Sequence, residues 1–218
     1  MRAIVRDLGL MGYQKAWEVQ KQVADEVIAG GPDTLLLVEH PPVLTLGASF
    51  HAENLLFTRE QIEAKGVNVH ETDRGGDVTY HGPGQLVMYP IFDVSRHGKD
   101  LHKWLRNLEE TQLVLLKDLG LEGRRFPPHT GAWIGDEKVA AIGVKIRKWV
   151  SLHGIALNCS NDLKEFSLII PCGIQGFGVT SLTQQLGSEV TVSEMKPLAI
   201  NAFAQVFGLN FSVVPTAT

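Results

Sequence analysis

The sequence predicts an α+β fold in which a mixed β-sheet is flanked by helices. Helix-like and strand-like stretches alternate along the 218 residues without a fixed repeat. The predicted strands at 138–147 and 151–158 are separated by a short turn, which favours direct pairing over the crossovers of a doubly wound parallel sheet. No linker or low-complexity segment interrupts the chain. We therefore expect residues 1–218 to form a single domain.

The first elements follow from local patterns near the beginning of the chain. Residues 2–8 are expected to form a short strand. Apolar residues recur at helical spacing over 12–29, and a Gly-Gly-Pro sequence follows, which predicts a helix with a defined end. The apolar run 34–38, bounded by His-Pro-Pro, predicts a buried strand.

The later elements are predicted by leucine spacing and by glycine stops. A short helix is expected at 58–65, and a longer helix at 99–119 with a glycine directly after it. Its expected apolar stripe consists of Leu101, Leu105, Leu108, Leu115 and Leu119. The strands 138–147 and 151–158 are expected to pair. A last helix near 194–207 should end at Gly208.

Composition excludes several classes of protein. Hydrophobic content of 44% and charged content of 20% are typical of soluble globular proteins. A formal net charge of −4 gives no basic field for general nucleic-acid binding. The start of the chain shows no signal or transit pattern, and no apolar run is long enough to cross a bilayer. We therefore expect a cytoplasmic protein without nucleic-acid or membrane partners.

Glycines cluster around residues 74–85, which read RGGDVTYHGPGQ. The segment matches neither GxGxxG nor the Walker pattern, so it predicts no nucleotide site. Tight turns alone would explain such a cluster. Alternatively, the glycines allow backbone N–H groups to approach a ligand closely, with Arg74 and His81 at either side of the opening.

Two cysteines and one lysine are candidates for chemistry. Cys159 continues the alternation of 151–158 and should be an ordinary buried residue, whereas Cys172 lies between proline and glycine on an expected sharp turn. A free thiol has a pKa of about 8.5 and needs a nearby base or positive charge to react at neutral pH. Lys138 opens an apolar strand, where an inward side chain would be partly desolvated; the sequence pattern alone favours an exposed lysine after the Asp-Glu turn.

The histidines do not suggest a metal site. His81, His129 and His153 are far apart in sequence and show no ligand spacing. We expect no bound metal.

Four ordered motifs together resemble the lipoyl(octanoyl) transferases. They are RGGDVTYHGPGQLVMYP at 74–90, GDEKVAAIGVKI at 135–146, SLHGIALN at 151–158 and IIPCGIQGFGVTSL at 169–182. The resemblance begins near Glu39-His40-Pro41 and ends at Leu182.

The resemblance implies a fold, an activity and a set of site residues. The fold would be similar to the catalytic domain of biotin and lipoate protein ligases. The activity would move an octanoyl or lipoyl group from acyl carrier protein to a lysine of lipoyl domains, in 2-oxoacid dehydrogenase complexes and the glycine-cleavage H protein, without a cofactor. Cys172 would carry the acyl group as a thioester, paired with Lys138. The acyl pocket would be lined by Arg74, Gly75, Gly76, Asp77, Val78, Thr79, Tyr80, His81, Ala141, Ile142, Gly143, Gly154, Ile155 and Ala156.

Two other functions remain open at this level. One is an ATP-dependent lipoate or biotin ligase, although such ligases need no catalytic cysteine. The other is a non-catalytic module that binds an acyl carrier or a lipoyl domain. Because both protein partners are typically acidic, local basic surface is expected at Arg124-Arg125 and at Lys145, Arg147 and Lys148; a simply solvated face is the alternative.

Overall fold

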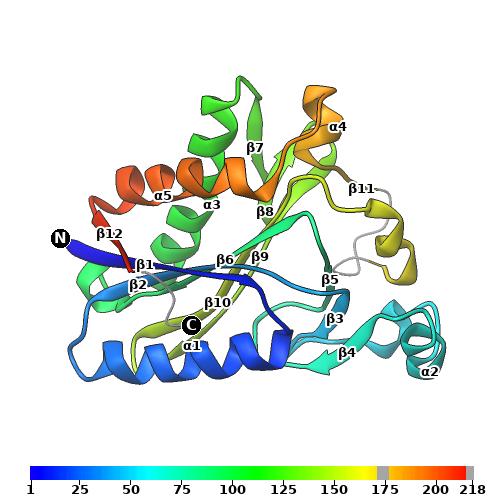
Figure 1. The fold of residues 1–218 in the computed structure, drawn as a ribbon, viewed down its shortest axis with the longest axis horizontal. Helices are drawn as coiled ribbons and strands as arrows, with labels where there is room; N and C mark the ends of the chain where they lie inside the picture. Colours follow the sequence, from blue (N-terminus) through cyan, green and yellow to red (C-terminus); the bar gives the residue numbers. More distant parts are fainter. Residues whose placement is uncertain (171–176, 215–218) are drawn as a thin grey trace.

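A strongly twisted mixed sheet forms the centre of the computed structural model, which describes residues 1–170 and 177–214 (Figure 1). The strand order is β12-β1-β2-β6-β10-β9-β8-β7, and the short β11 pairs with β9. β1 runs parallel to β2 and β12, whereas the pairs from β2 through β6, β10, β9 and β8 to β7 are antiparallel. The strands are β1 Arg2–Leu10, β2 Asp33–Glu39, β6 Gln85–Ile91, β7 Gly123–Phe126, β8 His129–Ile134, β9 Glu137–Arg147, β10 Val150–Asn158, β11 Gly178–Val179 and β12 Asn210–Val214.

Helices cover both faces of this sheet, which confirms the expected α+β class. One face packs on α1 (Tyr13–Ile28), whose Ala16 and Val23 join the core cluster with Leu152 of β10. The other face packs on α3 (Leu101–Asp118) and α5 (Val192–Phe207) through a larger cluster that contains Ile155 and Leu157 of β10 (Figure 1). The two faces of β10 therefore pack against different helices.

A second, smaller sheet lies beside the first and was not predicted. Its order is β4-β3-β5, formed by β3 Val43–Leu46, β4 Asn68–Glu71 and β5 Val78–His81. The short α2 (Arg59–Glu63) and the 3-10 helix Leu163–Leu168 pack against it, and α4 (Leu182–Leu186) follows β11. Four residues of the glycine-rich segment thus form a strand rather than a loop. Their β-branched and aromatic side chains favour that conformation.

The predicted helices are confirmed with small shifts at their ends. α1 ends at Ile28, and the cap residue Ala29 is followed by Gly30 with φ +97°, as the Gly-Gly-Pro sequence predicts. The predicted α3 stripe is wrong at its first position, because Leu101 is 44% exposed. Leu101 directly follows the capping residue Asp100, which accepts hydrogen bonds from the next backbone N–H groups, and the first buried residue is Trp104.

The paired strands at 138–147 and 151–158 are confirmed as β9 and β10. Strands β6, β7, β8 and β12 were not predicted. No helix among the described residues is long and apolar enough to cross a membrane.

Candidate active site

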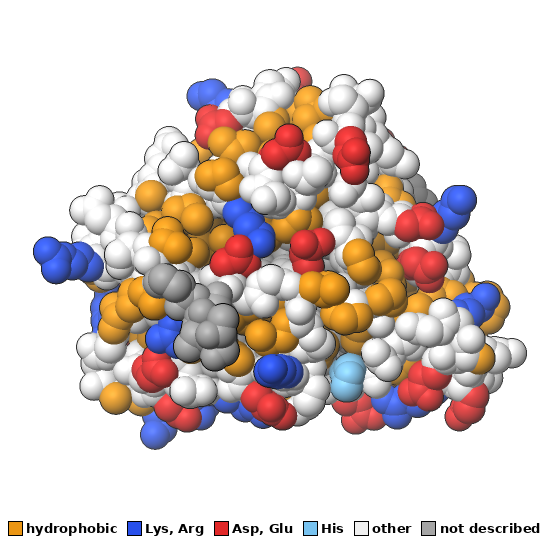
Figure 2. All heavy atoms as spheres, viewed as in Figure 1, with side chains coloured by type: hydrophobic (Ala, Val, Ile, Leu, Met, Phe, Trp, Pro, Cys, Tyr) orange, Lys and Arg blue, Asp and Glu red, His pale blue; other side chains and the backbone are white. Residues whose placement is uncertain are grey.

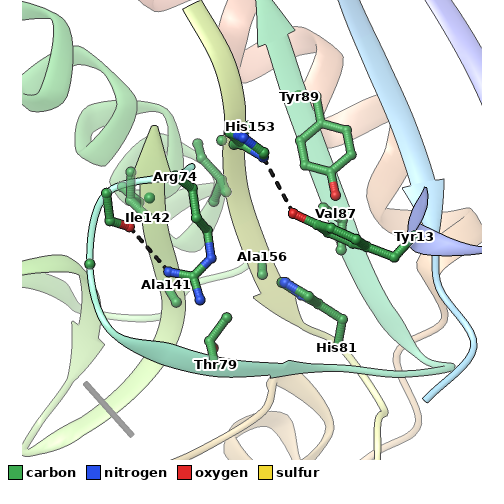
Figure 3. Close-up of a pocket in the computed structure, with 15 residues that line it drawn as sticks. Tyr13, Arg74, Thr79, His81, Val87, Tyr89, Ala141, Ile142, His153 and Ala156 are labelled. Atoms are coloured by element: carbon green, nitrogen blue, oxygen red, sulfur yellow. Dashed lines mark hydrogen bonds between the residues drawn. The ribbon is translucent and has the colours of Figure 1, made fainter. Parts of the chain in front are cut away.

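An inner cavity lies between α1, the Arg-Gly-Gly segment and the β6–β10–β9 part of the sheet (Figure 3). The space open to the centre of a water molecule is ≈ 50 Å³. That is room for several waters or for a narrow chain, and the walls are mostly apolar. The lining residues are Tyr13, Arg74, Gly75, Gly76, Thr79, His81, Val87, Tyr89, Ala141, Ile142, Gly143, His153, Gly154, Ile155 and Ala156.

The Arg-Gly-Gly segment is fixed against two strands. The buried Arg74 guanidinium donates to the Thr45 carbonyl of β3 at 2.6 Å and to the Thr45 hydroxyl. The Gly75 N–H donates to the Val144 carbonyl of β9 at 2.9 Å. A side chain on Gly143 would place its Cβ 2.7 Å from the Gly75 carbonyl oxygen, so glycine is needed there for backbone to approach backbone. The segment therefore forms a preorganised wall.

Strand alternation divides the predicted binding run 77–81 into two sets. Thr79 and His81 of β5 line the inner cavity, whereas Val78 and Tyr80 pack into the core of the small sheet. Asp77 lies outside the described cavity lining. Its carboxylate accepts hydrogen bonds from His51 and Asn54 and holds that segment in place.

Two neutral histidines lie at the cavity wall: His81 lines the cavity, and His40 lies behind it, with ring centres 5.8 Å apart. Burial, together with the nearby His40, lowers the pKa of His81 to about 3; the His81 ring donates to Gln85 Oε1 at 2.8 Å. Burial also lowers the pKa of His40 to about 4, and its Nδ1–H donates to the Met11 carbonyl at 2.7 Å. Both rings are therefore uncharged at neutral pH, which suits the apolar cavity.

The residues Tyr13, Val87, Tyr89 and His153 line the cavity but were not predicted as binding residues. Burial raises the pKa of Tyr13 to about 12 and of Tyr89 well above its ordinary value, so both hydroxyls stay protonated. Burial lowers the pKa of His153, against the opposing effect of the neighbouring Asp73. A polar residue in the middle of the apolar stretch SLHGIALN was the available signal for His153.

The Lys138 side chain points inward, which is one of the two orientations that the sequence left open. Its side chain is 8% exposed, and its Nζ lies 4.9 Å from the centre of the Trp133 ring. β9 carries one extra residue, Val139, between the partners of Ala132 and Trp133 on β8. A bulge of this kind re-aims the neighbouring side chains, so alternation along β9 does not extend to Lys138.

Lys138 lines a second, smaller cavity that adjoins the first. This lysine cavity has ≈ 20 Å³ open to the centre of a water molecule. It shares Thr79, Ala141 and Ala156 with the inner cavity. A chain that starts beside Lys138 thus passes these three residues to reach the inner cavity.

Of the two cysteines, Cys159 is as expected. Cys159 is fully buried, and burial raises the pKa of its thiol to about 12, so it is chemically inert. Cys172 lies outside the described residues. Among the described residues, no group of three or more histidine, cysteine, aspartate or glutamate side chains is arranged to hold a metal ion.

Comparison with known proteins decides the family. The model of the lipoyl protein ligase A/B catalytic domain matches residues 12–204. The chain belongs to the lipoyl protein ligase A/B catalytic-domain family. Within that family, an octanoyltransferase of Roseiflexus sp. (strain RS-1) is 47% identical over 214 residues, which cover 96% of this chain and 89% of that protein. An octanoyltransferase of Geobacter sp. (strain M21) is 48% identical over 193 residues, covering 88% of this chain and 91% of that protein.

Solved structures of lipoate and biotin protein ligases share the fold at low sequence identity. A lipoate-protein ligase A bound with ATP matches with a TM-score of 0.84 at 17% identity, covering all of this chain and 90% of that one. A biotin protein ligase from Aquifex aeolicus in complex with biotin and ATP matches with a TM-score of 0.58 at 12% identity, covering 95% of this chain and 71% of that one. These likenesses concern the fold alone, and they confirm the expected similarity to ligase catalytic domains.

Proposed function

We propose that this family member transfers an octanoyl group from an acyl carrier protein to a lysine of a lipoyl domain, by way of a thioester on Cys172. Octanoyl transfer in protein lipoylation is the activity of its octanoyltransferase relatives. The observation that carries the proposal is the buried Lys138, whose cavity adjoins an apolar inner cavity of chain-like width.

The first step exchanges one thioester for another. The Cys172 thiolate attacks the donor carbonyl, a new C–S bond forms, and the bond to the carrier sulfur breaks. The carrier leaves as a thiol once it has taken a proton. Because both acyl compounds are thioesters, this step is close to balanced and can run in both directions.

The second step makes the process effectively irreversible. The acceptor lysine amine attacks the Cys172 thioester, the C–S bond breaks, and an amide forms. An amide is more stable than a thioester, so no ATP is needed.

Lys138 supplies the proton transfers that both steps require. It accepts the Cys172 proton before attack, and it passes a proton to the leaving carrier thiol. In the second step it removes a proton from the incoming amine. The low exposure of Lys138 and its place against Trp133 hold the Nζ atom in one position.

The apolar inner cavity supplies affinity for the acyl chain. Each methylene that leaves water contributes about 0.8 kcal/mol, so chain length is a usable signal for selectivity. Ala141, Gly143, Gly154 and Ala156, four small residues on β9 and β10, leave space for the chain between the sheet and α1.

The partners are an octanoyl donor and lipoyl-domain acceptors. The proposed donor is acyl carrier protein, and the proposed acceptors are the E2 subunits of 2-oxoacid dehydrogenases and the H protein. The face drawn in Figure 2 carries intermingled positive and negative side chains rather than a field of one sign. Among the proposed docking residues, Arg124 pairs with Asp136 at 2.6 Å and Arg147 with Asp25 at 2.6 Å. The exposed Lys145 and Lys148 are therefore the main residues proposed to contact the partner proteins.

Intact mass analysis after incubation with octanoyl carrier tests the mechanism. The wild-type protein should gain an octanoyl group that hydroxylamine removes, and Cys172→Ser should form no such thioester. Cys159→Ala is the matched control, because that buried thiol should contribute nothing to acylation. Lys138→Met removes the amine, keeps an unbranched side chain one atom shorter, and should slow acylation by roughly 100- to 10,000-fold.

The same experiment separates the two other functions. An ATP-dependent ligase would form an adenylate from lipoate and ATP. It would then transfer the lipoyl group from this adenylate to the acceptor without Cys172. A binding module would retain the carrier but no acyl group. An octanoyl adduct that survives in Cys172→Ser and is lost in Cys159→Ala would contradict the proposal.

A further inference from the structure

His153 lies on the opposite face of β10 from the one that its position predicts. Leu152 and Ala156 belong to the core cluster on the α1 side, and Ile155 and Leu157 belong to the cluster on the α3/α5 side. Strict alternation would place His153 with the second pair. Its ring instead contacts Trp17 of α1, with ring centres 5.7 Å apart.

The cause is a left-handed backbone at one residue. His153 has φ +57°, although it lies within a strand and carries a side chain. Such a conformation is unfavourable for residues other than glycine and persists only where the surroundings enforce it. The His153 N–H donates to the Oε1 atom of the buried Gln20 of α1 at 2.7 Å, so this backbone group is satisfied outside the sheet.

The ring is then held in place from two sides by Asp73 and Tyr13, and Figure 3 shows the contact with Tyr13. Its Nε2 lies 2.8 Å from Asp73 Oδ1, and its Nδ1 lies 3.4 Å from the Tyr13 hydroxyl. Asp73 directly precedes the Arg-Gly-Gly wall, and Val144, the cross-strand partner of His153, accepts the hydrogen bond from Gly75. The Arg-Gly-Gly segment is therefore hydrogen-bonded to Val144, and the ring belongs to His153, the residue that pairs with Val144 across β9 and β10.

The position of the ring relative to Lys138 gives it a role. The cavity lining leads from Lys138 past Ala141 and Ala156 to His153 and Tyr13. Val144, the residue opposite His153, lies three positions after Ala141 on β9, which corresponds to roughly 10 Å along an antiparallel strand. That is the scale of a medium-length alkyl chain.

We propose that His153 is the end wall of the acyl cavity and determines the longest acyl chain that the enzyme accepts. This inference rests on the proposed function for its substrate class. The left-handed backbone turns the ring across the far end of the cavity, and Asp73 and Tyr13 keep it there. A side chain on the ordinary face of β10 would leave that end open.

His153→Gly tests the proposal, because glycine adopts the same backbone without strain and removes the ring. Transfer rates are measured with hexanoyl, octanoyl, decanoyl and dodecanoyl carrier. Each additional buried methylene strengthens binding about fourfold, so the ratio of decanoyl to octanoyl kcat/KM should rise by up to about 15-fold in the variant. His153→Asn, which also tolerates a left-handed backbone, should give a smaller rise in the same direction and serves if the glycine variant does not fold.

Lys99→Gly is the matched control. Lys99 has φ +54°, is exposed and lies outside the cavity lining, so its replacement should leave the ratio at the wild-type value. A ratio in folded His153→Gly or His153→Asn equal to that of Lys99→Gly would overturn the proposal.

A binding measurement separates this inference from the proposed function. Octanoate and decanoate are added to wild type and to His153→Gly, and the rise in melting temperature is recorded, since a ligand stabilises the folded state that binds it. Decanoate should stabilise the variant more than octanoate does, with the order reversed in wild type. The absence of acyl transfer by wild type would contradict the proposed function, while the order of these shifts would still decide the role of His153.

Discussion

Replacing Asp77 by alanine should destabilise the protein without acting directly on substrate. Asp77 is 8% exposed as a residue, and its carboxylate accepts hydrogen bonds from Asn54 Nδ2 at 2.6 Å and from the Val78 N–H at 2.7 Å. It also accepts from the N–H and ring of His51 at 3.2 and 3.1 Å. The side chain therefore joins the segment 51–54 to the start of β5.

The size of the effect follows from the donors that remain. Asp77→Ala leaves the buried Asn54 amide and the Val78 N–H without an acceptor, and each costs about 1–3 kcal/mol, so we expect a loss of about 3 kcal/mol in the free energy of unfolding. For a protein of this size, 1 kcal/mol corresponds to about 2–4 °C, which gives a fall in Tm of roughly 6–12 °C. Asp77→Asn retains one acceptor oxygen, so its Tm should fall by about half as much.

Thermal unfolding followed by circular dichroism gives the Tm values, and steady-state kinetics with octanoyl carrier gives KM. The structure predicts a large change in Tm and an unchanged KM well below that Tm. A Tm that moves by less than about 2 °C together with a raised KM would refute the reasoning, because Asp77 would then contact the substrate, as the sequence motif predicted.

Three further predictions concern packing, protonation and docking. Gly154→Ala should destabilise the protein by about 3 kcal/mol or more in urea unfolding, because the new Cβ would overlap a backbone oxygen of β6. The control is Gly12→Ala, whose Cβ would meet no atom within 4 Å, and it should change stability by under about 1 kcal/mol. The folded His81 has a pKa of about 3 against 6.5 unfolded, so only the unfolded chain gains a proton between these values, and stability falls on acidification by about 1.4 kcal/mol per pH unit. His81→Asn should remove that part of the slope in unfolding curves at pH 7, 6 and 5, and an unaltered slope would disprove the assignment. Lys148→Glu should raise KM for the carrier but not for a small octanoyl thioester, whereas equal changes for both donors would exclude docking at this residue.

Much of the fold follows from short-range patterns. The 3.6-residue spacing of Ala16, Val23 and Val27 predicts α1, and the glycines after α1, α3 and α5 predict where these helices end. The alternation around Cys159 correctly predicts a buried, unreactive thiol. These features depend on residues a few positions apart, so the sequence carries them directly.

The sequence predicted which segments meet at the cavity, but not which of their side chains face it. The motifs correctly bring the Arg-Gly-Gly segment, 141–143 and 154–156 to one cavity. They also place Asp77, Val78 and Tyr80 among the lining residues, where the structure turns these side chains away. A motif identifies a continuous segment, whereas a strand presents only every second side chain to one side.

The sequence by itself determined the α+β class, the positions of the principal helices and the segments that meet at the site. Only the tertiary structure decided that Lys138 is buried and that His153 faces α1. Both depend on a local break in strand alternation, a bulge at Val139 and a left-handed φ at His153. Such breaks are maintained by partners distant in sequence, such as Gln20 for the His153 N–H, and these partners come into contact only when the chain has folded.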